Sequence, residues 1–252
     1  MIEVLKKKKW HVLLIAVISI GIATSLISFA IIQRLDYQRM QEYFERTAEE
    51  RYSALEREIE SNLQVLESIK AHYAATGKVR RSDFQNLVKP LLLNHSSIQA
   101  LEWIPRIADS QRNMYEETAK RDGFHNFQIS DRRAQGVMVK SPRRSEYFPV
   151  YFVEPYKTNE IALGYDLASN PARKEALDRS RDTGKKVATR RIVLVQEKAG
   201  QYGFLVFEPV YRKYLPSNTI QERRRNLQGF ILGVFRISDI LRSNITKPHN
   251  IA

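Results

Sequence analysis

The chain opens with a long apolar run. Residues 10–33 contain no formally charged side chain. As a helix with a rise of about 1.5 Å per residue they would extend roughly 36 Å, enough to cross a hydrocarbon core of about 30 Å. The run is longer than the core of a signal peptide, although Ser28-Phe29-Ala30 loosely resembles a cleavage site. A buried helix of a soluble protein is the other alternative, but residues 10–33 are apolar on all faces, which favours a transmembrane helix.

The charges that flank this run predict its orientation. Four consecutive lysines, residues 6–9, directly precede it, whereas the residues that follow it mix both signs. The positive-inside rule therefore makes residues 1–9 a cytoplasmic tip and puts everything after residue 33 outside. The predicted localisation is the cell inner membrane, single-pass, with a cytoplasmic N-terminus, a periplasmic or extracellular C-terminal domain, and the lipid bilayer as a partner.

A second long helix pattern follows directly. Residues 34–73 contain neither Gly nor Pro and carry one apolar stripe with steps of three and four. The stripe consists of Phe44, Ala48, Tyr52, Leu55, Ile59, Leu63, Leu66, Ile69 and Tyr73. We expect a stalk helix over residues 34–76 that ends at Gly77. Its stripe needs a partner, and we expect both a second copy (a homodimer through the stalk helix) and a domain folded back along it.

The rest of the chain mixes helix and strand patterns. Helices are predicted after the capping-box pattern Ser82-Asp83-Phe84-Gln85, over residues 110–121, and from Asn170-Pro171 to Gly184. Strands are predicted at 98–107, 127–129, 147–153, 161–167, 187–189, 192–196, 202–211 and 228–237, with a basic polar loop at 212–227 and a helix beginning at 237–241. This mixture predicts an α+β domain with an antiparallel sheet at residues 77–240, followed by a tail at 241–252.

Composition and charge narrow the function. A hydrophobic content of 43% excludes a wholly disordered chain. Lys and Arg number 41 against 28 Asp and Glu, a net charge of +13. The arginines cluster in pairs and in the triplet Arg223-Arg224-Arg225, but no nucleic-acid-binding module accompanies them. We therefore expect solvated loops near anionic lipid headgroups and no nucleic-acid partner.

The sequence has no motif for catalysis or metal binding. With no cysteine it has no disulfide, thiolate metal site or cysteine nucleophile. No GxxxxGK[ST], GxGxxG or GxSxG motif is present, and the five histidines lack HExxH spacing. We expect no catalytic residue, no metal and no cofactor. A hydrolase would require histidines and carboxylates to converge in one cleft.

Short motifs follow one another in a fixed order through residues 80–237. They are Glu102-Trp103-Ile104-Pro105-Arg106, Glu146-Tyr147-Phe148-Pro149-Val150, Glu154-Pro155, Gly164-Tyr165-Asp166-Leu167, Pro171, Arg173, Ala176-Leu177, Thr183-Gly184, Thr189, Glu208-Pro209-Val210-Tyr211 and Gly233-Val234-Phe235. In order and spacing the series resembles the CHASE domain, the extracytoplasmic sensory domain of receptor histidine kinases and diguanylate or adenylate cyclases. The resemblance implies a stalk helix packed against two PAS-like lobes, a small-molecule ligand in the membrane-distal lobe, and a dimeric module.

The resemblance also implies ligand-binding residues. Asp166 matches the acidic residue that hydrogen-bonds the purine ring of cytokinins in the plant members, so a purine-like molecule is one candidate ligand. Its alternative role, left open, is a turn residue that caps nearby N–H groups. Ala188 matches a position that offers backbone hydrogen bonds to the ligand, and Thr189 follows it. Phe207 and Tyr211 are candidates for the same cavity. Ordinary strand or core packing is the alternative for these four residues.

Two functions fit these observations. Family members normally continue into the rest of a membrane-proximal lobe, a second membrane helix and an output domain. This chain ends at residue 252, so we expect an incomplete membrane-proximal lobe and no output domain of its own. The first function is a membrane-anchored extracytoplasmic small-molecule sensor for signal transduction. The alternative is a non-catalytic dimerising protein that partners a full-length receptor and modulates it.

Overall fold

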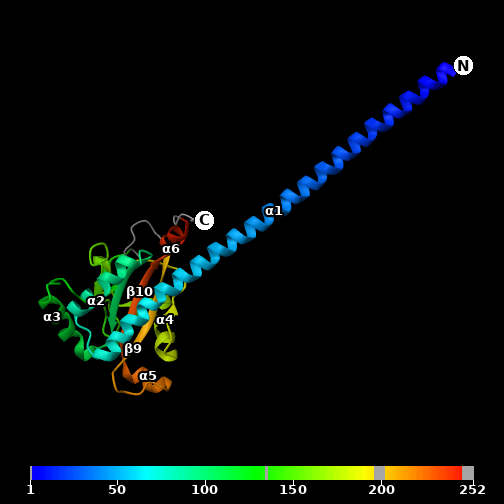
Figure 1. The fold of residues 1–252 in the computed structure, drawn as a ribbon. Coiled ribbons are helices and arrows are strands. Elements are labelled where there is room, and N and C mark those ends of the chain that lie inside the picture. The colour runs from blue at the N-terminus through cyan, green and yellow to red at the C-terminus, as the bar shows by residue number, and fades with distance from the viewer. Residues whose placement is uncertain (1, 134–135, 196–201, 246–252) are drawn as a thin grey trace. The chain divides into compact units, whose positions relative to one another are not determined.

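The computed structural model describes residues 2–133, 136–195 and 202–245. They contain one very long helix and a mixed domain around an antiparallel sheet (Figure 1). The chain divides into two compact units, Met1–Ala54 and Leu55–Ala252. The fold is therefore mixed helix and antiparallel sheet, as the sequence predicts. The two-lobed, PAS-like arrangement stays a prediction.

Helix α1 spans Ile2–Thr76 and covers both helix patterns of the N-terminal part. Among the described residues it is the one helix long and apolar enough to cross a membrane, with a mean hydropathy of 2.5 in its most apolar window. The described side chains between residues 15 and 32 are all exposed. α1 ends where the sequence predicts: Gly77 has a φ of 72° and donates its N–H to the Tyr73 carbonyl.

The apolar stripe of α1 has two different environments. Leu66, Ile69 and Tyr73 are buried in the core of the second unit. Phe44 and Tyr52, which lie in the first unit, are 72% and 66% exposed. One part of the stripe thus packs against the chain's own domain, as predicted, and the other part carries large apolar side chains that are exposed among the described residues.

The main sheet has six strands in the order β6-β1-β10-β9-β7, with β8 also paired to β9. Its long members are β1 (Ile98–Pro105), β9 (Tyr202–Tyr211) and β10 (Leu227–Arg236). The short ones are β6 (Phe152–Glu154), β7 (Val187–Ala188) and β8 (Ile192–Val193). The long strands pair antiparallel, with Trp103 opposite Ile231 and Ile231 opposite Glu208. All three were predicted at nearly these bounds.

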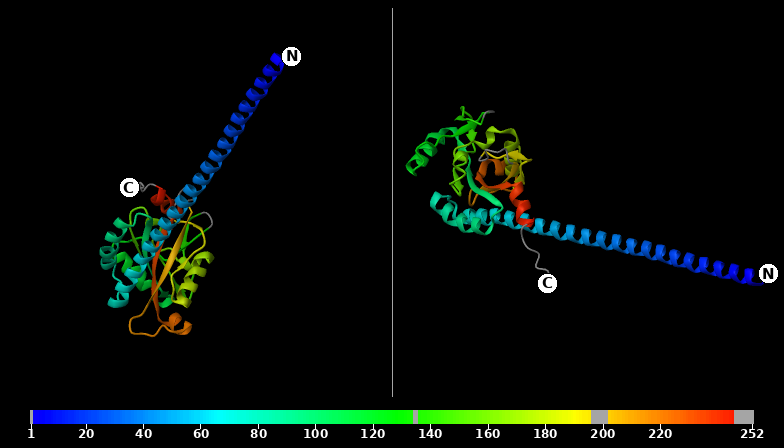
Figure 2. Two further views of the ribbon diagram at one scale, coloured as in Figure 1. Left: turned by 45° about the vertical axis from the view of Figure 1, so that its right-hand side comes forward. Right: turned by 90° about the horizontal axis from the view of Figure 1, so that it is seen from above.

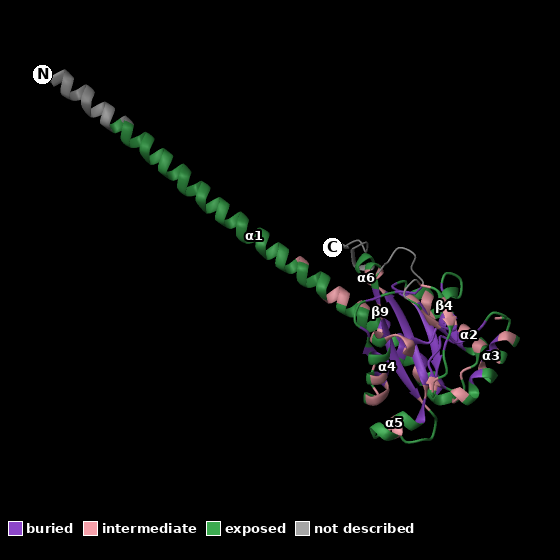
Figure 3. Ribbon diagram, turned by 180° about the vertical axis from the view of Figure 1, so that it is seen from behind, coloured by how far each residue is buried: buried purple, intermediate pink, exposed green. Residues whose placement is uncertain are grey.

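Helices cover both faces of this sheet (Figure 2). The end of α1 and helix α2 (Arg81–Asn94) pack on one face, where the core includes Leu101, Val206 and Phe235. Helix α4 (Pro171–Thr183) packs on the other, against residues such as Phe207 and Leu232. The three long strands are buried between these layers (Figure 3).

The remaining elements surround the sheet. The helical ones are η1 (Asp109–Gln111), α3 (Arg112–Arg121), η2 (Glu160–Ala162), η3 (Leu167–Ser169), α5 (Ile220–Asn226) and α6 (Ile237–Ile245). Two small two-stranded sheets pair β2 (Ile107–Ala108) with β5 (Glu146–Tyr147), and β3 (Ser130–Arg132) with β4 (Met138–Lys140). Helix α4 has the predicted ends, with Asn170 accepting from the Arg173 N–H at 3.2 Å and Gly184 at a φ of 74°.

Several local predictions are wrong. Residues 161–167 form no strand, because Gly164, at a φ of 84°, turns the chain between two 3-10 turns. Ser82 does not cap α2, whose N-cap is Arg80 without a side-chain hydrogen bond. The predicted strand at 127–129 starts only at residue 130, and the one at 147–153 is interrupted at residues 148–151. The basic loop contains α5, which begins with a capping box of Thr219 and Glu222.

Gly164 is the residue on which the turn before α4 depends. Its N–H donates to the Val150 carbonyl at 2.8 Å, and its carbonyl accepts from the Ser130 N–H at 2.9 Å. A Cβ at this position would lie 2.4 Å from the Gln128 carbonyl oxygen. Both the positive φ and this contact exclude a side chain.

We predict that Gly164→Ala destabilises the domain by at least about 2 kcal/mol, because strain and the backbone clash act together. Thermal unfolding of the full chain in detergent, followed by circular dichroism, measures the effect. Gly123→Ala is the matched control, because Gly123 has a φ of 97° but nothing within 4 Å of a Cβ. The control should cost about 1 kcal/mol. Equal losses for the two variants would contradict the assigned role of the Gln128 contact.

Candidate ligand-binding site

Asp166 lies at the N-cap of η3 and is completely buried. Its Oδ1 accepts from the N–H groups of Phe148 at 2.9 Å and Ala168 at 3.2 Å. Its Oδ2 accepts from Arg144 Nη1 at 2.8 Å, and Arg144 also pairs with Asp131. Burial raises the pKa of Asp166, while these N–H groups and Arg144 oppose that rise. The capping role that the sequence left open is therefore present, and the ligand role stays a prediction.

The next two candidates belong to the edge of the sheet. Ala188 lies in β7, where it is exposed and opposite Val206 of β9. Thr189 exchanges two hydrogen bonds with Leu205: its N–H donates to the Leu205 carbonyl, and its Oγ1 accepts from the Leu205 N–H. The Thr189 side chain thus extends the pairing of β7 with β9.

The two aromatic candidates occupy packed positions. Phe207 is fully buried, and its ring meets that of Phe230 edge-on at 5.6 Å between centroids. The Tyr211 hydroxyl donates to the Arg181 carbonyl at 2.7 Å, and burial raises its pKa to about 12. None of the five sequence-predicted residues lines the two cavities described next, although Tyr165 and Leu167, on either side of Asp166, do.

A cavity of about 440 Å³ opens between the end of β3, the first turn of α4 and β8. This volume falls within the range of small-molecule sites. Its described lining comprises Arg132, Arg133, Tyr165, Asn170, Ala172, Arg173, Ile192 and Val193. A neighbouring pocket of about 10 Å³ shares the lining residues Tyr165 and Arg173 with this cavity and extends to Glu102 of β1. We call the first space the arginine cavity and the second the inner pocket.

Arg173 lines both spaces. It is 5% exposed, and α4 places it there because Asn170 and Pro171 fix the start of the helix. Its Nη1 donates to the Tyr165 hydroxyl at 3.2 Å and its Nη2 to the Val193 carbonyl at 3.3 Å. Its Nε has no hydrogen-bond partner among the described residues. Burial lowers the pKa of this guanidinium, and the nearby Arg132 lowers it further.

Glu102 forms the deep end of the inner pocket. It is 2% exposed, on the face of β1 opposite to Leu101 and Trp103. Burial raises its pKa to about 8, and the positive charge of Arg173 limits the rise. Below that pH the group is a neutral acid that can both donate and accept a hydrogen bond.

Sequence reasoning missed these residues as site residues. Glu102 and Arg173 belong to the quoted motifs, but nothing in their local sequence shows that they converge. The available signals were a carboxylate inside an otherwise apolar strand pattern, IQALEWIP, and an arginine three residues after a helix N-cap. Each marks a polar group that must be buried with a partner from another element.

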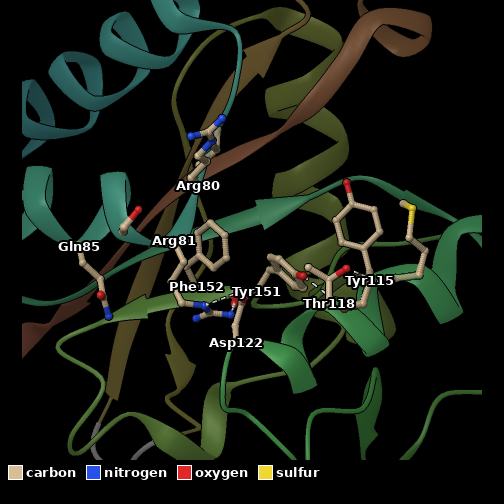
Figure 4. Close-up of a pocket in the computed structure, with 11 residues that line it drawn as sticks. Arg80, Arg81, Gln85, Tyr115, Thr118, Asp122, Tyr151 and Phe152 are labelled. Atoms are coloured by element: carbon tan, nitrogen blue, oxygen red, sulfur yellow. Dashed lines mark hydrogen bonds and ion pairs between the residues drawn. The ribbon is translucent and has the colours of Figure 1, made fainter.

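Apart from these two spaces, a cavity of about 640 Å³ lies between the first turn of α2, helix α3 and the start of β6 (Figure 4). Arg81 lines one wall of this cavity, with its guanidinium carbon 4.4 Å from the Phe152 ring centroid. Its Nε lies 3.5 Å from Oδ2 of Asp122, with which it forms an ion pair. Its Nη2 also donates to the Tyr151 carbonyl at 3.0 Å. Arg81 therefore has both a carboxylate and a carbonyl partner within the protein.

The arrangement around Arg173 supports binding. In the part of the chain that the structure describes, no three His, Cys, Asp or Glu side chains converge as a metal site would require. The lining of the arginine cavity offers guanidinium donors and a phenol beside aliphatic side chains. Such a set can orient a small molecule by hydrogen bonds and cover its apolar part.

The sequence profile of the CHASE domain matches residues 77–252. The match covers most of the chain and begins directly after α1, which ends at Thr76. The chain therefore belongs to the CHASE domain family, a family of sensory domains. The profile includes the sheet, α4 and both spaces around Arg173.

Two relatives are signalling proteins that are much longer than this chain. The chain is 21% identical to the hybrid signal transduction histidine kinase A of Dictyostelium discoideum, over 96% of this chain and 11% of that protein. It is 29% identical to the germination-specific adenylate cyclase of the same organism, over 47% of this chain and 14% of that protein. The chain thus spans about a tenth to a seventh of the length of these relatives.

Among solved structures, the ligand-binding domain of the Pseudomonas aeruginosa PAO1 amino acid chemoreceptor PctC, in complex with GABA, aligns with a TM-score of 0.41 at 12% identity. The alignment covers 75% of this chain and 60% of that one.

We predict that the stability of the domain depends on pH through Glu102. Its pKa is about 8 in the folded state and about 4.3 in an unfolded chain. The folded state keeps this proton while the unfolded state loses it, so the contribution of Glu102 to stability falls as pH rises from about 4.3 to 8. Glu102→Gln removes this dependence. Relative to the wild type, the variant should gain on the order of 3 kcal/mol between pH 5 and pH 8.

Thermal unfolding of both proteins at the two pH values measures that gain. Glu60→Gln, at an exposed position of α1, is the control and should follow the wild type at both values. A Glu102→Gln profile parallel to that of the wild type would show that the buried carboxyl does not hold its proton.

Proposed function

We propose that this chain is a membrane-anchored extracytoplasmic sensor module for signal transduction, which binds a small molecule and carries out no catalysis. One observation carries the proposal. The arginine cavity and its inner pocket lie on one face of a sheet whose other face packs on α1. A ligand on the first face would therefore act on the sheet that holds α1.

Strand β9 provides the most direct connection between the two faces. Leu205 lines the inner pocket, and three residues further Glu208 points to the opposite face. The Glu208 carboxylate accepts from Lys70 Nζ of α1 at 2.5 Å, and its side chain is only 3% exposed. Burial raises the pKa of Glu208, and Lys70 opposes this rise. A shift of β9 would thus disturb a charge pair whose carboxylate is buried, and a buried carboxylate is costly to leave without its partner.

Strand β10 provides a second connection. Val234 lines the inner pocket, while the neighbouring Phe235 packs in the core that contains α1. At Gly233 a Cβ would lie 3.2 Å from Leu66 of α1, so helix and strand backbone approach closely. Close-packed layers of this kind transmit displacements. A ligand shifts the equilibrium only as far as it prefers one state of the sheet.

The sequence supports the membrane anchor and its orientation. Residues 10–33 would span the bilayer, and the lysines at residues 6–9 favour a cytoplasmic N-terminus. The domain would then meet solutes outside the cytoplasm, in the periplasm for an inner-membrane protein. The exposed stripe residues Phe44 and Tyr52 support a homodimer through the stalk helix. A heterologous receptor helix on the same stripe would instead make the chain a modulator.

We predict that one class of extracellular metabolite stabilises the full chain in lipid nanodiscs. The panel comprises amino acids, organic acids, purine bases and nucleosides, and sugars. A ligand at 100 times its Kd adds about 2.7 kcal/mol, which corresponds to a rise in Tm of roughly 5–10 °C. Ala172→Phe, which places a phenyl ring in the arginine cavity, should abolish the shift. A flat response to the whole panel, or a shift that survives Ala172→Phe, would contradict binding in this cavity.

We predict that Tyr52→Cys, in a chain that otherwise has no cysteine, forms a disulfide-linked homodimer when membranes are oxidised. Residue 52 lies on the exposed stripe, so two copies that share the stripe bring these thiols together. Glu50→Cys, on the opposite side of the helix, is the control and should remain monomeric. Crosslinks of Tyr52→Cys to a second protein would favour the modulator function, and equal crosslinking of the two variants would contradict a specific stripe.

A further inference from the structure

The arginine cavity is strongly positive. Three of its described lining residues are arginines, namely Arg132, Arg133 and Arg173, and none of the described lining residues is acidic. Low-dielectric walls of one charge sign concentrate the potential inside a cavity and attract oppositely charged solutes. The positive charge therefore favours an anion.

Arg173 has donors that the described residues do not satisfy. A guanidinium carries five N–H groups. The hydrogen bonds to Tyr165 and Val193 use two of them, one each from Nη1 and Nη2. The buried Nε has no partner among the described residues, and the same is true of the buried Nε of Arg132. The Nε of Arg173 lies on the same edge of the planar group as Nη2, and such an edge matches the two oxygens of a carboxylate.

Burying such donors is unfavourable unless an acceptor is supplied. The residue is 5% exposed, and burial lowers the pKa of its guanidinium. Donors left unsatisfied on a buried charged group cost much more than those on a buried neutral group. A bound anion would offset this cost and would also reduce the repulsion between Arg173 and Arg132.

We propose that the arginine cavity binds a small organic carboxylate, and that Arg173 holds the carboxylate group. The proposal rests on the proposed function, because it names the chemical class of the ligand of that same site.

The surroundings favour a carboxylate over a phosphate. Phosphate sites commonly use the free N–H groups of a helix N-terminus. At the start of α4 the Arg173 N–H is bound by the Asn170 side chain, and the Lys174 N–H by the Asn170 carbonyl. These two backbone N–H groups are thus already used, and the site offers guanidinium donors instead. A neutral purine would leave the positive charge uncompensated.

The cavity also limits the size of the ligand. Ala172, Ile192 and Val193 supply apolar surface for a carbon skeleton. The inner pocket measures about 10 Å³, about the volume that one water needs. The skeleton must therefore lie in the outer space of about 440 Å³, with its carboxylate turned toward Arg173.

Isothermal titration of the full chain in nanodiscs tests the proposal with matched pairs of acids and amides. The pairs are butyrate with butyramide, benzoate with benzamide, and nicotinate with nicotinamide; inorganic phosphate and adenine complete the set. Members of a pair share shape and differ in charge. At least one carboxylate should bind at least tenfold more tightly than its amide and more tightly than phosphate or adenine.

Variants then identify the group that binds the carboxylate. Arg173→Gln should weaken carboxylate binding at least tenfold, and Arg173→Lys should weaken it too, because an ammonium lacks the planar edge. Arg179→Gln removes the same charge from an exposed position on α4 and should leave the affinity unchanged. Arg133→Gln, at the exposed side of the cavity, offers a test without disturbing a buried residue and should weaken binding two- to fivefold, roughly, by reducing the local potential.

The outcomes separate this inference from the proposed function. Two outcomes would overturn the proposal of a carboxylate ligand held by Arg173 but would still support a sensor. One is tighter binding of adenine or of the amides, and the other is carboxylate binding that survives Arg173→Gln and Arg133→Gln. Preferential binding of phosphate would overturn it in the same way. Failure of every carboxylate to bind would also overturn it. The proposed function fails only if the wider metabolite panel is flat as well.

Discussion

The alternation of side chains along three long strands is the constraint on which the rest of the structure depends. Successive residues of a strand point to opposite faces, so each strand contributes to two layers at once. Glu102 and Trp103 are neighbours in β1, yet one lines the inner pocket and the other packs in the core beside α1. The same holds for Val234 and Phe235 in β10. A displacement on one face therefore cannot leave the other unchanged, because both layers are close-packed.

The start of α4 determines the chemistry on the cavity side. Asn170 and Pro171 fix the first turn, and that turn places the Arg173 guanidinium over the Tyr165 ring, with the guanidinium carbon 5.2 Å from the ring centroid. Packing the helix against the sheet then buries the charge. The same burial would strengthen an interaction of the guanidinium with an anion, because such an interaction is stronger in a low dielectric than in water. The cost of burial and the capacity to bind thus have the same origin.

The sequence predicted those elements that local patterns specify. The apolar run, the stripe, the strands β9 and β10 and the ends of α4 all follow from periodicity or capping. Residues 161–167 were mispredicted because bonds to distant segments, such as the Ser130 and Val150 contacts of Gly164, decide their conformation. The candidate site could not be located for the same reason. Glu102 and Arg173 lie far apart in the sequence, and only the packing of α4 on the sheet brings them to one pocket.

Asp166 illustrates how a residue can serve a binding site without lining it. Its carboxylate accepts from the Phe148 and Ala168 N–H groups and from Arg144, and its own N–H donates to the Ser130 carbonyl. These four bonds hold the backbone on both sides of it, which positions Tyr165 and Leu167 in the wall of the inner pocket. A carboxylate that is saturated in this way is a rigid support, because each buried acceptor lost would leave donors unpaired. The motif Gly164-Tyr165-Asp166-Leu167 therefore shapes the wall of the inner pocket, next to the arginines that line the arginine cavity.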